Sequence, residues 1–105
     1  MTPRELASIP TYPTQGTAPA LEDPETREYL AECFNRYFKG DFGDISEEDT
    51  AANNSALADE CGRVIAKYPA AAKLESDIYI ISDFEAGKLQ DIEQSQTVVL
   101  YSFEY

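Results

Sequence analysis

The sequence contains no histidine, no tryptophan and only two cysteines among its 105 residues. Histidine is a common general base at neutral pH and a frequent zinc ligand, so its absence argues against both chemistries. Cys33 and Cys61 do not have the spacing of metal ligands, and neither has a base nearby in the sequence that would activate it as a nucleophile. We therefore expect no enzymatic activity, no metal site and no cofactor.

Basic residues are scarce as well. The chain has 8 Lys and Arg against 20 Asp and Glu, which gives a net charge of −12 and a pI near 4.1. This charge excludes unassisted binding to nucleic acid or to an anionic membrane, so a partner should be basic. The acidity is uneven, because residues 1–60 carry 13 acids and 4 bases whereas residues 61–105 carry 7 and 4. Solubility alone is the competing explanation.

Long apolar runs are missing, and residues 1–10 lack the apolar centre of a signal peptide. We therefore expect a cytoplasmic protein with both thiols reduced and no membrane partner. A chain of 105 residues with 43% hydrophobic content fits a single domain.

Four prolines interrupt the first 22 residues: Pro3, Pro10, Pro13 and Pro19. Proline resists both helix and β-ladder formation. The sequence therefore predicts a Pro-rich, partly ordered arm over residues 1–22, mostly extended or mobile, and a single α+β domain over residues 23–105. Three apolar side chains of the arm could dock on that domain: Ile9, Tyr12 and Leu21.

The first predicted helix spans residues 24–39. Asp23 is its N-cap, Pro24 occupies the first helical position, and Gly40 ends it. Its apolar stripe recurs at steps of three and four residues: Leu30, Cys33, Phe34, Tyr37 and Phe38.

The second predicted helix begins after Ser46, which serves as its N-cap, and runs to about Glu60. Asn53 and Asn54 are poor helix formers in its middle. The residues that it should bury are Ala52, Ala56, Leu57 and, at its end, Cys61.

From Gly62 onward the pattern changes to strands. β-Branched and aromatic residues predict strands over residues 63–68, 77–82 and 97–101. The segments between them are short enough to join antiparallel neighbours. We therefore predict an α+β fold in which two helices cover one face of a small antiparallel, three-stranded meander. Four tyrosines near these strands would serve either ordinary packing or a protein interface: Tyr68, Tyr79, Tyr101 and Tyr105.

An acidic turn joins the two predicted helices. Gly40 and Gly43 supply the positive φ values of a sharp reversal, and Phe42 should anchor the loop to the core. Asp41-Phe42-Gly43 has the letters of the kinase magnesium motif, but the chain lacks the other kinase signatures. The carboxylates also lack the alternating ligand spacing of an EF-hand. A solvated acidic corner is the favoured interpretation.

Several short, different motifs lie along most of the chain: Lys39–Asp44, Glu47–Asp49 with Asn53, Arg63–Tyr68, Ile78–Ile81, Thr97–Leu100 and Phe103–Tyr105. Over roughly residues 27–105 they resemble a family of small bacterial proteins that are found on plasmids, phages and other mobile elements. That family has a Gly-Asp-Trp-Gly type of turn, an acidic step followed by an asparagine, and a Thr-rich final strand that leads to a terminal Glu-Tyr.

The chain departs from this family pattern at three places. Phe42 replaces the tryptophan, Tyr37 lies near a usual histidine, and Ser82-Asp83-Phe84 stands where the family has Thr-Glu-Ala. The resemblance implies a mobile-element setting and does not imply a chemistry.

Charge and setting together favour an acidic, non-enzymatic inhibitor or modulator of phage or mobile-element origin. As a DNA mimic, it would occupy the basic nucleic-acid-binding surface of a host defence protein, either a CRISPR effector or a restriction enzyme. The residues expected to make this contact are Asp41, Asp44, Glu47, Glu48, Asp49, Asp59 and Glu60. One alternative is a small structural or accessory protein that forms a homodimer through its sheet and is acidic for solubility only. Another is an enzyme that acts through the clustered carboxylates.

Overall fold

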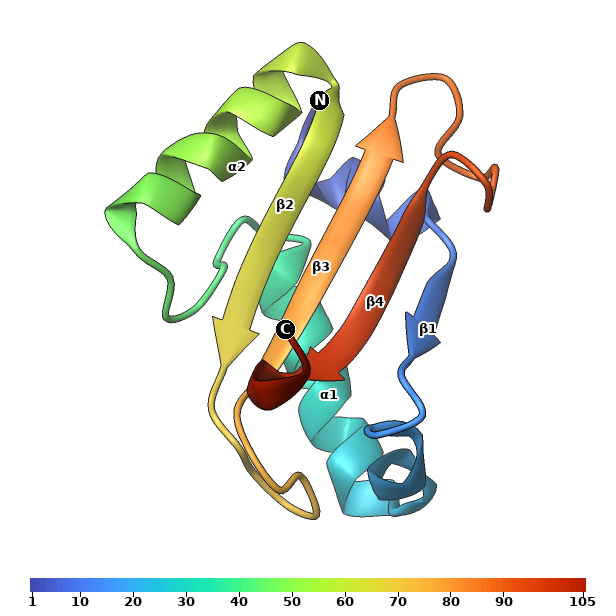
Figure 1. Cartoon of the computed structure of the whole chain (residues 1–105), viewed down its shortest axis with the longest axis vertical. Helices are drawn as coiled ribbons and strands as arrows, with labels where there is room; N and C mark the ends of the chain where they lie inside the picture. Colours follow the sequence, from blue (N-terminus) through green and yellow to red (C-terminus); the bar gives the residue numbers. More distant parts are fainter.

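A computed structural model describes all of residues 1–105 as an α+β domain (Figure 1). The predicted fold class is therefore confirmed. Neither of the two α-helices has the length and apolar content that crossing a membrane would require. The elements are helices α1 (Pro24–Tyr37) and α2 (Glu47–Asp59), strands β1 (Thr11–Pro13), β2 (Cys61–Tyr68), β3 (Ile78–Glu85) and β4 (Gln96–Tyr101), and 3-10 turns over Pro3–Ser8, Ala18–Glu22 and Ser102–Glu104.

The strands form one mixed sheet in the order β1-β4-β3-β2. β2, β3 and β4 make the predicted antiparallel meander, and β2 and β3 are both longer than predicted. The prediction of three strands was incomplete, because Thr11–Pro13 of the arm pairs in parallel with β4. Hydrogen bonds also flank this fourth strand, from Thr97 N–H to the Pro10 carbonyl at 2.8 Å and from Thr14 N–H to the Val99 carbonyl at 3.0 Å.

The N-terminal arm is ordered to a greater extent than its prolines suggested. Its first 3-10 turn buries Leu6, and Ile9 is only 3% exposed. Thr17 is fully buried and donates its hydroxyl to the Val99 carbonyl at 3.0 Å. Proline is compatible with the first turn of a helical segment and with an edge strand, so here it shapes the arm and does not keep it mobile.

Helix α1 covers one face of the sheet (Figure 1). Asp23 caps its N-terminus by accepting the N–H of Thr26 at 2.9 Å, as predicted, and the helix ends at Tyr37, two residues before the predicted end. Tyr37 is fully buried and donates its hydroxyl to Ser82 Oγ at 2.7 Å. The face of the sheet beneath α1 is completely buried: Val64, Ala66, Tyr68, Ile78, Ile80, Ser82, Phe84, Thr97, Val99 and Tyr101.

Helix α2 does not cover the same face, so the prediction of two helices on one face was wrong. It lies along the free edge of β2 (Figure 1). Its buried residues are Asn53, Ala56 and Leu57, whereas Ala52 and Cys61, which the sequence predicted to be buried, are exposed. A narrow buried stripe of small side chains suits packing against a strand edge better than packing across a sheet.

Candidate protein-binding surfaces

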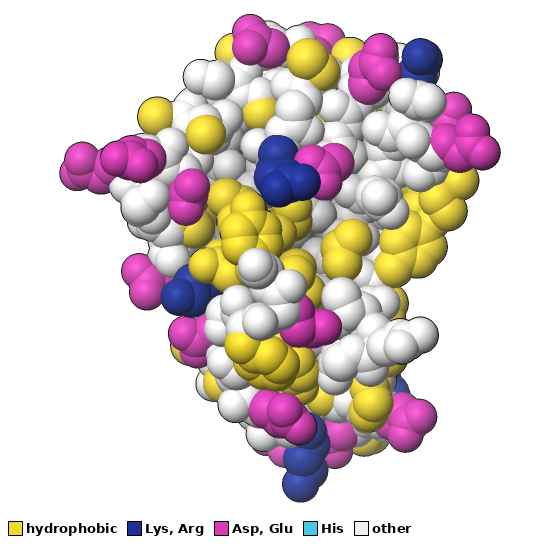
Figure 2. Space-filling view, in the orientation of Figure 1, with side chains coloured by type: hydrophobic (Ala, Val, Ile, Leu, Met, Phe, Trp, Pro, Cys, Tyr) yellow, Lys and Arg dark blue, Asp and Glu magenta, His cyan; other side chains and the backbone are white.

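The carboxylates predicted to bind a partner line α2 and the turn before it. We call this set the acidic surface: Asp41, Asp44, Glu47, Glu48, Asp49, Asp59 and Glu60. Asp49 is partly buried and the other six are exposed. No Lys or Arg lies between Asp41 and Glu60 in the chain. In Figure 2, acidic side chains project from the side of the molecule that α2 occupies in Figure 1.

The structure divides the acidic surface between the two ends of α2. Asp44 and Glu47–Asp49 lie at the N-terminal end, and Asp59 and Glu60 lie at the C-terminal end. At a rise of about 1.5 Å per residue, the ends of this 13-residue helix are about 18 Å apart. Residues 50–58 between them are uncharged. The acidic surface is therefore two carboxylate clusters on one helix and not a continuous patch.

Two of the seven carboxylates already have a cationic neighbour. Asp41 accepts two hydrogen bonds from the Arg36 guanidinium, at 2.7 and 3.2 Å, and one from the Gly43 N–H at 3.2 Å. These bonds, above all the one from Arg36, lower the pKa of Asp41. Glu60 lies 3.6 Å from the amino group of Met1. The five that form no ion pair carry the charge that a partner would meet: Asp44, Glu47, Glu48, Asp49 and Asp59.

The first turn of α2 accommodates three of these acids without a neighbouring cation. Ser46 Oγ accepts the N–H of Asp49 at 3.1 Å, which confirms the predicted N-cap. Unpaired N–H groups at a helix N-terminus carry partial positive charge, and that charge favours nearby carboxylates. The charges of Glu47 and Glu48 therefore remain available at an exposed helix end.

The turn before α2 is bound to the free edge of β2. Gly40 and Gly43 have φ angles of 86° and 74°, and Phe42 is 8% exposed, all as predicted. Lys67 donates its N–H to the Phe42 carbonyl at 3.0 Å and accepts the N–H of Asp44 at 2.9 Å. Gly43 consequently forms an isolated parallel bridge with Lys67. The turn thus acts as a short extra strand beside β2.

Asn53 pairs with the free edge of β2 next to this turn, a role that the sequence did not predict. Its Nδ2 donates to the Ile65 carbonyl at 2.8 Å, and its Oδ1 accepts the Ile65 N–H at 2.9 Å. The side-chain amide therefore replaces a neighbouring strand for one residue, and it is fully buried. A signal was present, because Asn53 precedes Ala56 and Leu57 by three and four residues and so lies on the buried stripe.

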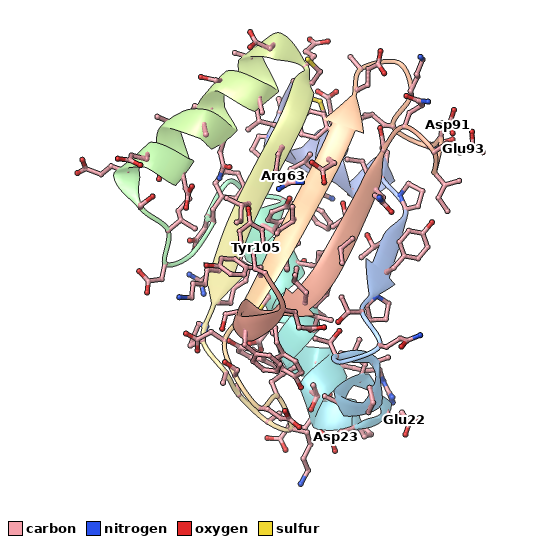
Figure 3. All side chains as sticks on the ribbon, viewed as in Figure 1. Glu22, Asp23, Arg63, Asp91, Glu93 and Tyr105 are labelled. Atoms are coloured by element: carbon pink, nitrogen blue, oxygen red, sulfur yellow. The ribbon has the colours of Figure 1, made fainter.

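A second candidate surface lies on the side of the sheet away from α1. The sequence had indicated a homodimer through the sheet and an interface role for the tyrosines, without assigning other residues to this side. Figure 3 shows Arg63 and Tyr105 over this side of the strands. Part of it is a shallow hollow of about 230 Å³. We call this side of the strands the open face: Arg63, Ile65, Lys67, Tyr79, Ile81, Asp83, Val98, Leu100 and Tyr105. Arg63 and Tyr105 are exposed, Ile65 and Ile81 are buried, and the other five are partly buried.

The four tyrosines near the strands divide between the two sides of the sheet. Tyr68 and Tyr101 are buried, and the Tyr68 hydroxyl donates to the Asp41 carbonyl at 2.8 Å. Tyr79 and Tyr105 lie together on the open face, with ring centroids 5.1 Å apart. Core packing therefore explains the first pair, whereas the second pair is accessible to a partner.

The thiols, the possible metal ligands and the other surface hollows do not come together in a further site. Cys33 is buried and Cys61 is exposed, and both are free thiols. No group of three or more Asp, Glu or Cys side chains is arranged to hold a metal ion. Two further surface hollows lie away from both named surfaces, lined by Ser8, Gly87, Leu89 and Gln90 and by Glu25, Glu28, Tyr29, Glu32, Ala71 and Ala72.

Comparison of the chain with protein-family models, with curated proteins and with solved structures found no match. The resemblance to mobile-element proteins therefore stays a prediction. Two motifs that carry it have a structural role here, because the turn over residues 40–44 and Asn53 both cover the free edge of β2. Function is consequently inferred from the acidic surface and the open face.

Proposed function

We propose that the protein is an acidic, non-enzymatic inhibitor or modulator whose acidic surface binds the basic nucleic-acid-binding surface of another protein. The observation that carries this proposal is the set of five carboxylates on α2 and its preceding turn that form no ion pair, in a chain of net charge −12. A basic cleft that accommodates phosphates also attracts a fixed array of carboxylates.

The attachment of α2 to the sheet supports this mode of binding. Both hydrogen bonds of the Asn53 side chain fix the helix to β2, and two backbone hydrogen bonds of Lys67 fix the preceding turn. Carboxylates on a fixed helix lose less conformational freedom on binding than carboxylates on a mobile loop. More of the electrostatic attraction then appears as affinity.

The proposed class of partner follows from charge and from the resemblance to mobile-element proteins. A CRISPR effector holds nucleic acid in a positively charged channel, and a restriction enzyme must also bind the phosphates of DNA. A phage or plasmid benefits when either defence is blocked in the host cytoplasm. We therefore propose a CRISPR effector or a restriction enzyme as the partner, with the protein acting as a DNA mimic.

Capture from a bacterial lysate on the immobilised protein tests this proposal. We expect a nucleic-acid-binding protein to be retained at low salt and displaced by excess duplex DNA, because the DNA and the acidic surface would compete for one basic site. High salt should release the same protein, since exposed charges are screened. The proposal would be contradicted if no retention were salt-sensitive, or if duplex DNA displaced nothing.

A further inference from the structure

Two isoleucines at the centre of the open face are buried although no helix covers this side of the sheet. Ile65 is 8% exposed and Ile81 is 6% exposed, and the two lie directly opposite each other on β2 and β3. Helix α1 covers the other face, and α2 lies along the edge of β2 (Figure 1). An antiparallel sheet usually presents polar residues on a face that no second layer covers. Neighbouring side chains of the same chain must therefore cover these two.

Two cross-strand pairs provide part of this cover. They flank the isoleucines two residues away along both strands, on the same side of the sheet. Arg63 lies 2.8 Å from Asp83 in an ion pair, and the Lys67 amino group lies 5.8 Å from the centre of the Tyr79 ring. Long side chains of this kind cover apolar surface with their stems while their charges stay in water. A shallow hollow of about 230 Å³ remains beside the ion pair.

Tyr105 reaches over the open face from outside the sheet. Its ring centroid lies 5.1 Å from that of Tyr79, and its hydroxyl accepts a hydrogen bond from Arg63 at 3.4 Å. The side chain therefore connects the two flanking pairs, and it borders the hollow together with Val98 and Leu100. Figure 3 shows Tyr105 over the strands. Because the ring is itself 63% exposed, it covers the face and is not part of the core.

The segment that carries Tyr105 is bound to the N-terminal arm. We call residues 102–105 the strap. Glu104 Oε1 accepts the Tyr101 N–H at 2.8 Å and the Thr14 hydroxyl at 2.9 Å. Thr14 directly follows β1, so this carboxylate joins the strap to the edge strand of the sheet. Hydrogen bonds to a carboxylate are roughly twice as strong as those between neutral groups. Glu104 therefore fixes the point at which the chain turns back over the sheet.

The strap also contacts both sides of the sheet. On the side of α1, the Phe103 ring stacks on Tyr101 with centroids 5.0 Å apart. On the open face, the Tyr105 ring packs over β3. Ser102 donates its N–H to the Asp77 carbonyl at 2.8 Å, which binds the start of the strap to the connection between β2 and β3. These attachments together hold the Tyr105 ring in place over the open face.

The edges of the sheet are already protected against pairing with another chain. The Asn53 amide and the bridge at Gly43 occupy the free edge of β2. β1 forms the other edge, and it has three residues, of which Pro13 has no N–H to donate. Short edge strands and prolines are common means by which proteins prevent edge pairing. Because α1 covers one face, the open face is the remaining part of the sheet through which copies could associate.

We propose that the strap closes the open face and so prevents copies of this protein from associating through the sheet. With the strap displaced, apolar side chains of three strands would form one accessible surface: Ile65, Tyr79, Ile81, Val98 and Leu100. A contiguous exposed apolar surface promotes association. The strap therefore opposes the homodimer through the sheet that the sequence left open as an alternative. It acts within one chain and does not depend on the proposed inhibitory function.

Tyr105→Ser and Glu104→Ala test the strap in the purified protein. The first removes the ring over the open face, and the second removes both hydrogen bonds of the carboxylate. We expect the wild type to bind the uncharged apolar dye Nile red weakly and to sediment as an 11.7 kDa monomer at every concentration. Both variants should bind several-fold more dye and form larger species as their concentration rises, because the apolar face becomes accessible.

Two control variants should behave as the wild type does. Glu104→Gln keeps an oxygen that can accept both hydrogen bonds. Ile92→Ser removes another large exposed apolar side chain, 54% exposed, in the connection between β3 and β4. Glu104 and Tyr105 are themselves exposed, so all variants should unfold cooperatively on heating, as followed by circular dichroism. A wild type that self-associates would overturn the proposal. So would folded Tyr105→Ser and Glu104→Ala variants that bind no more dye than Ile92→Ser.

Discussion

Replacing Gly43 with alanine is expected to lower the free energy of unfolding by more than about 3 kcal/mol. The new Cβ would lie 2.0 Å from the backbone oxygen of Lys67, a separation that no side-chain movement can relieve. The turn would have to leave β2 and lose both of its hydrogen bonds to Lys67, at about 1 kcal/mol each. The φ of +74° costs an alanine about 1–2 kcal/mol more.

Gly87→Ala is the matched control for this substitution. Gly87 has a φ of +79°, and a Cβ added there meets nothing within 4 Å. Gly87→Ala should therefore lower the free energy of unfolding only by the cost of a positive φ for alanine, about 1–2 kcal/mol. Urea unfolding gives the free energy of unfolding of both variants, provided that their m-values are equal. The difference between the two variants is the cost of the contact between the new Cβ and Lys67, because both variants share the backbone strain of a positive φ. Equal destabilisation of the two variants would show that the contact between the turn and β2 contributes little to stability.

Replacing Asn53 with alanine should cost about 3 kcal/mol. The change removes both hydrogen bonds to Ile65 and leaves the N–H and the carbonyl of that residue without partners under α2. An unpaired buried polar group costs about 1–3 kcal/mol. The better helix propensity of alanine returns less than about 1 kcal/mol. Thermal unfolding should show a melting temperature lower by roughly 10–20 °C.

Asn54→Ala provides the control, because it makes the same substitution one position along α2. Asn54 is exposed, and the helix propensity gained there should leave stability unchanged or slightly raised. If Asn53→Ala and Asn54→Ala gave the same melting temperature, the buried amide would not be the feature that fixes α2 to the sheet.

Local sequence signals were sufficient for the helix starts and for the acidic turn. Asp23 and Ser46 cap the two helices as predicted, and the glycines on either side of Phe42 have the expected positive φ. Each of these features depends on residues within one turn of the chain. Capping oxygens and glycine backbone freedom act over that range, so a single sequence reveals them.

Long-range pairing was the part that local signals could not provide. Nothing in Thr11–Pro13 indicates a parallel partner, because the pairing depends on Thr97 lying beside Pro10 in the folded sheet. The sequence indicated only that Asn53 is a poor helix former in α2, because its hydrogen bonds to Ile65 form only when β2 lies beside the helix. Tertiary context overrode helix propensity at that position.

Local signals likewise revealed more of the acidic surface than of the open face. Charge identified the acidic surface, although the pairing of Asp41 with Arg36 required the structure. The predicted fold already left one face of the sheet uncovered, but the apolar run Ile78–Ile81 does not show which of its side chains lie on that face. The structure places Tyr79 and Leu100 there, and both are partly exposed.

The acidic surface can be neutralised without disturbing the fold. Glu47→Gln, Glu48→Gln and Asp49→Asn together remove three charges from the exposed end of α2, with an expected stability change of no more than about 1 kcal/mol. A matched triple variant removes three charges from exposed positions of α1 instead: Glu25→Gln, Glu28→Gln and Glu32→Gln. Both variants have the same net charge, so they differ only in the surface that has been neutralised.

The affinity of these two variants for the captured nucleic-acid-binding protein, measured at low and at high salt, tests the central claim most directly. We predict that the α2 variant stays folded and loses most of its affinity and salt dependence, because the attraction arises from that end of the helix. The α1 variant should bind nearly as the wild type does. Equal binding by the two variants at both salt concentrations would contradict the assignment of the acidic surface as the binding site.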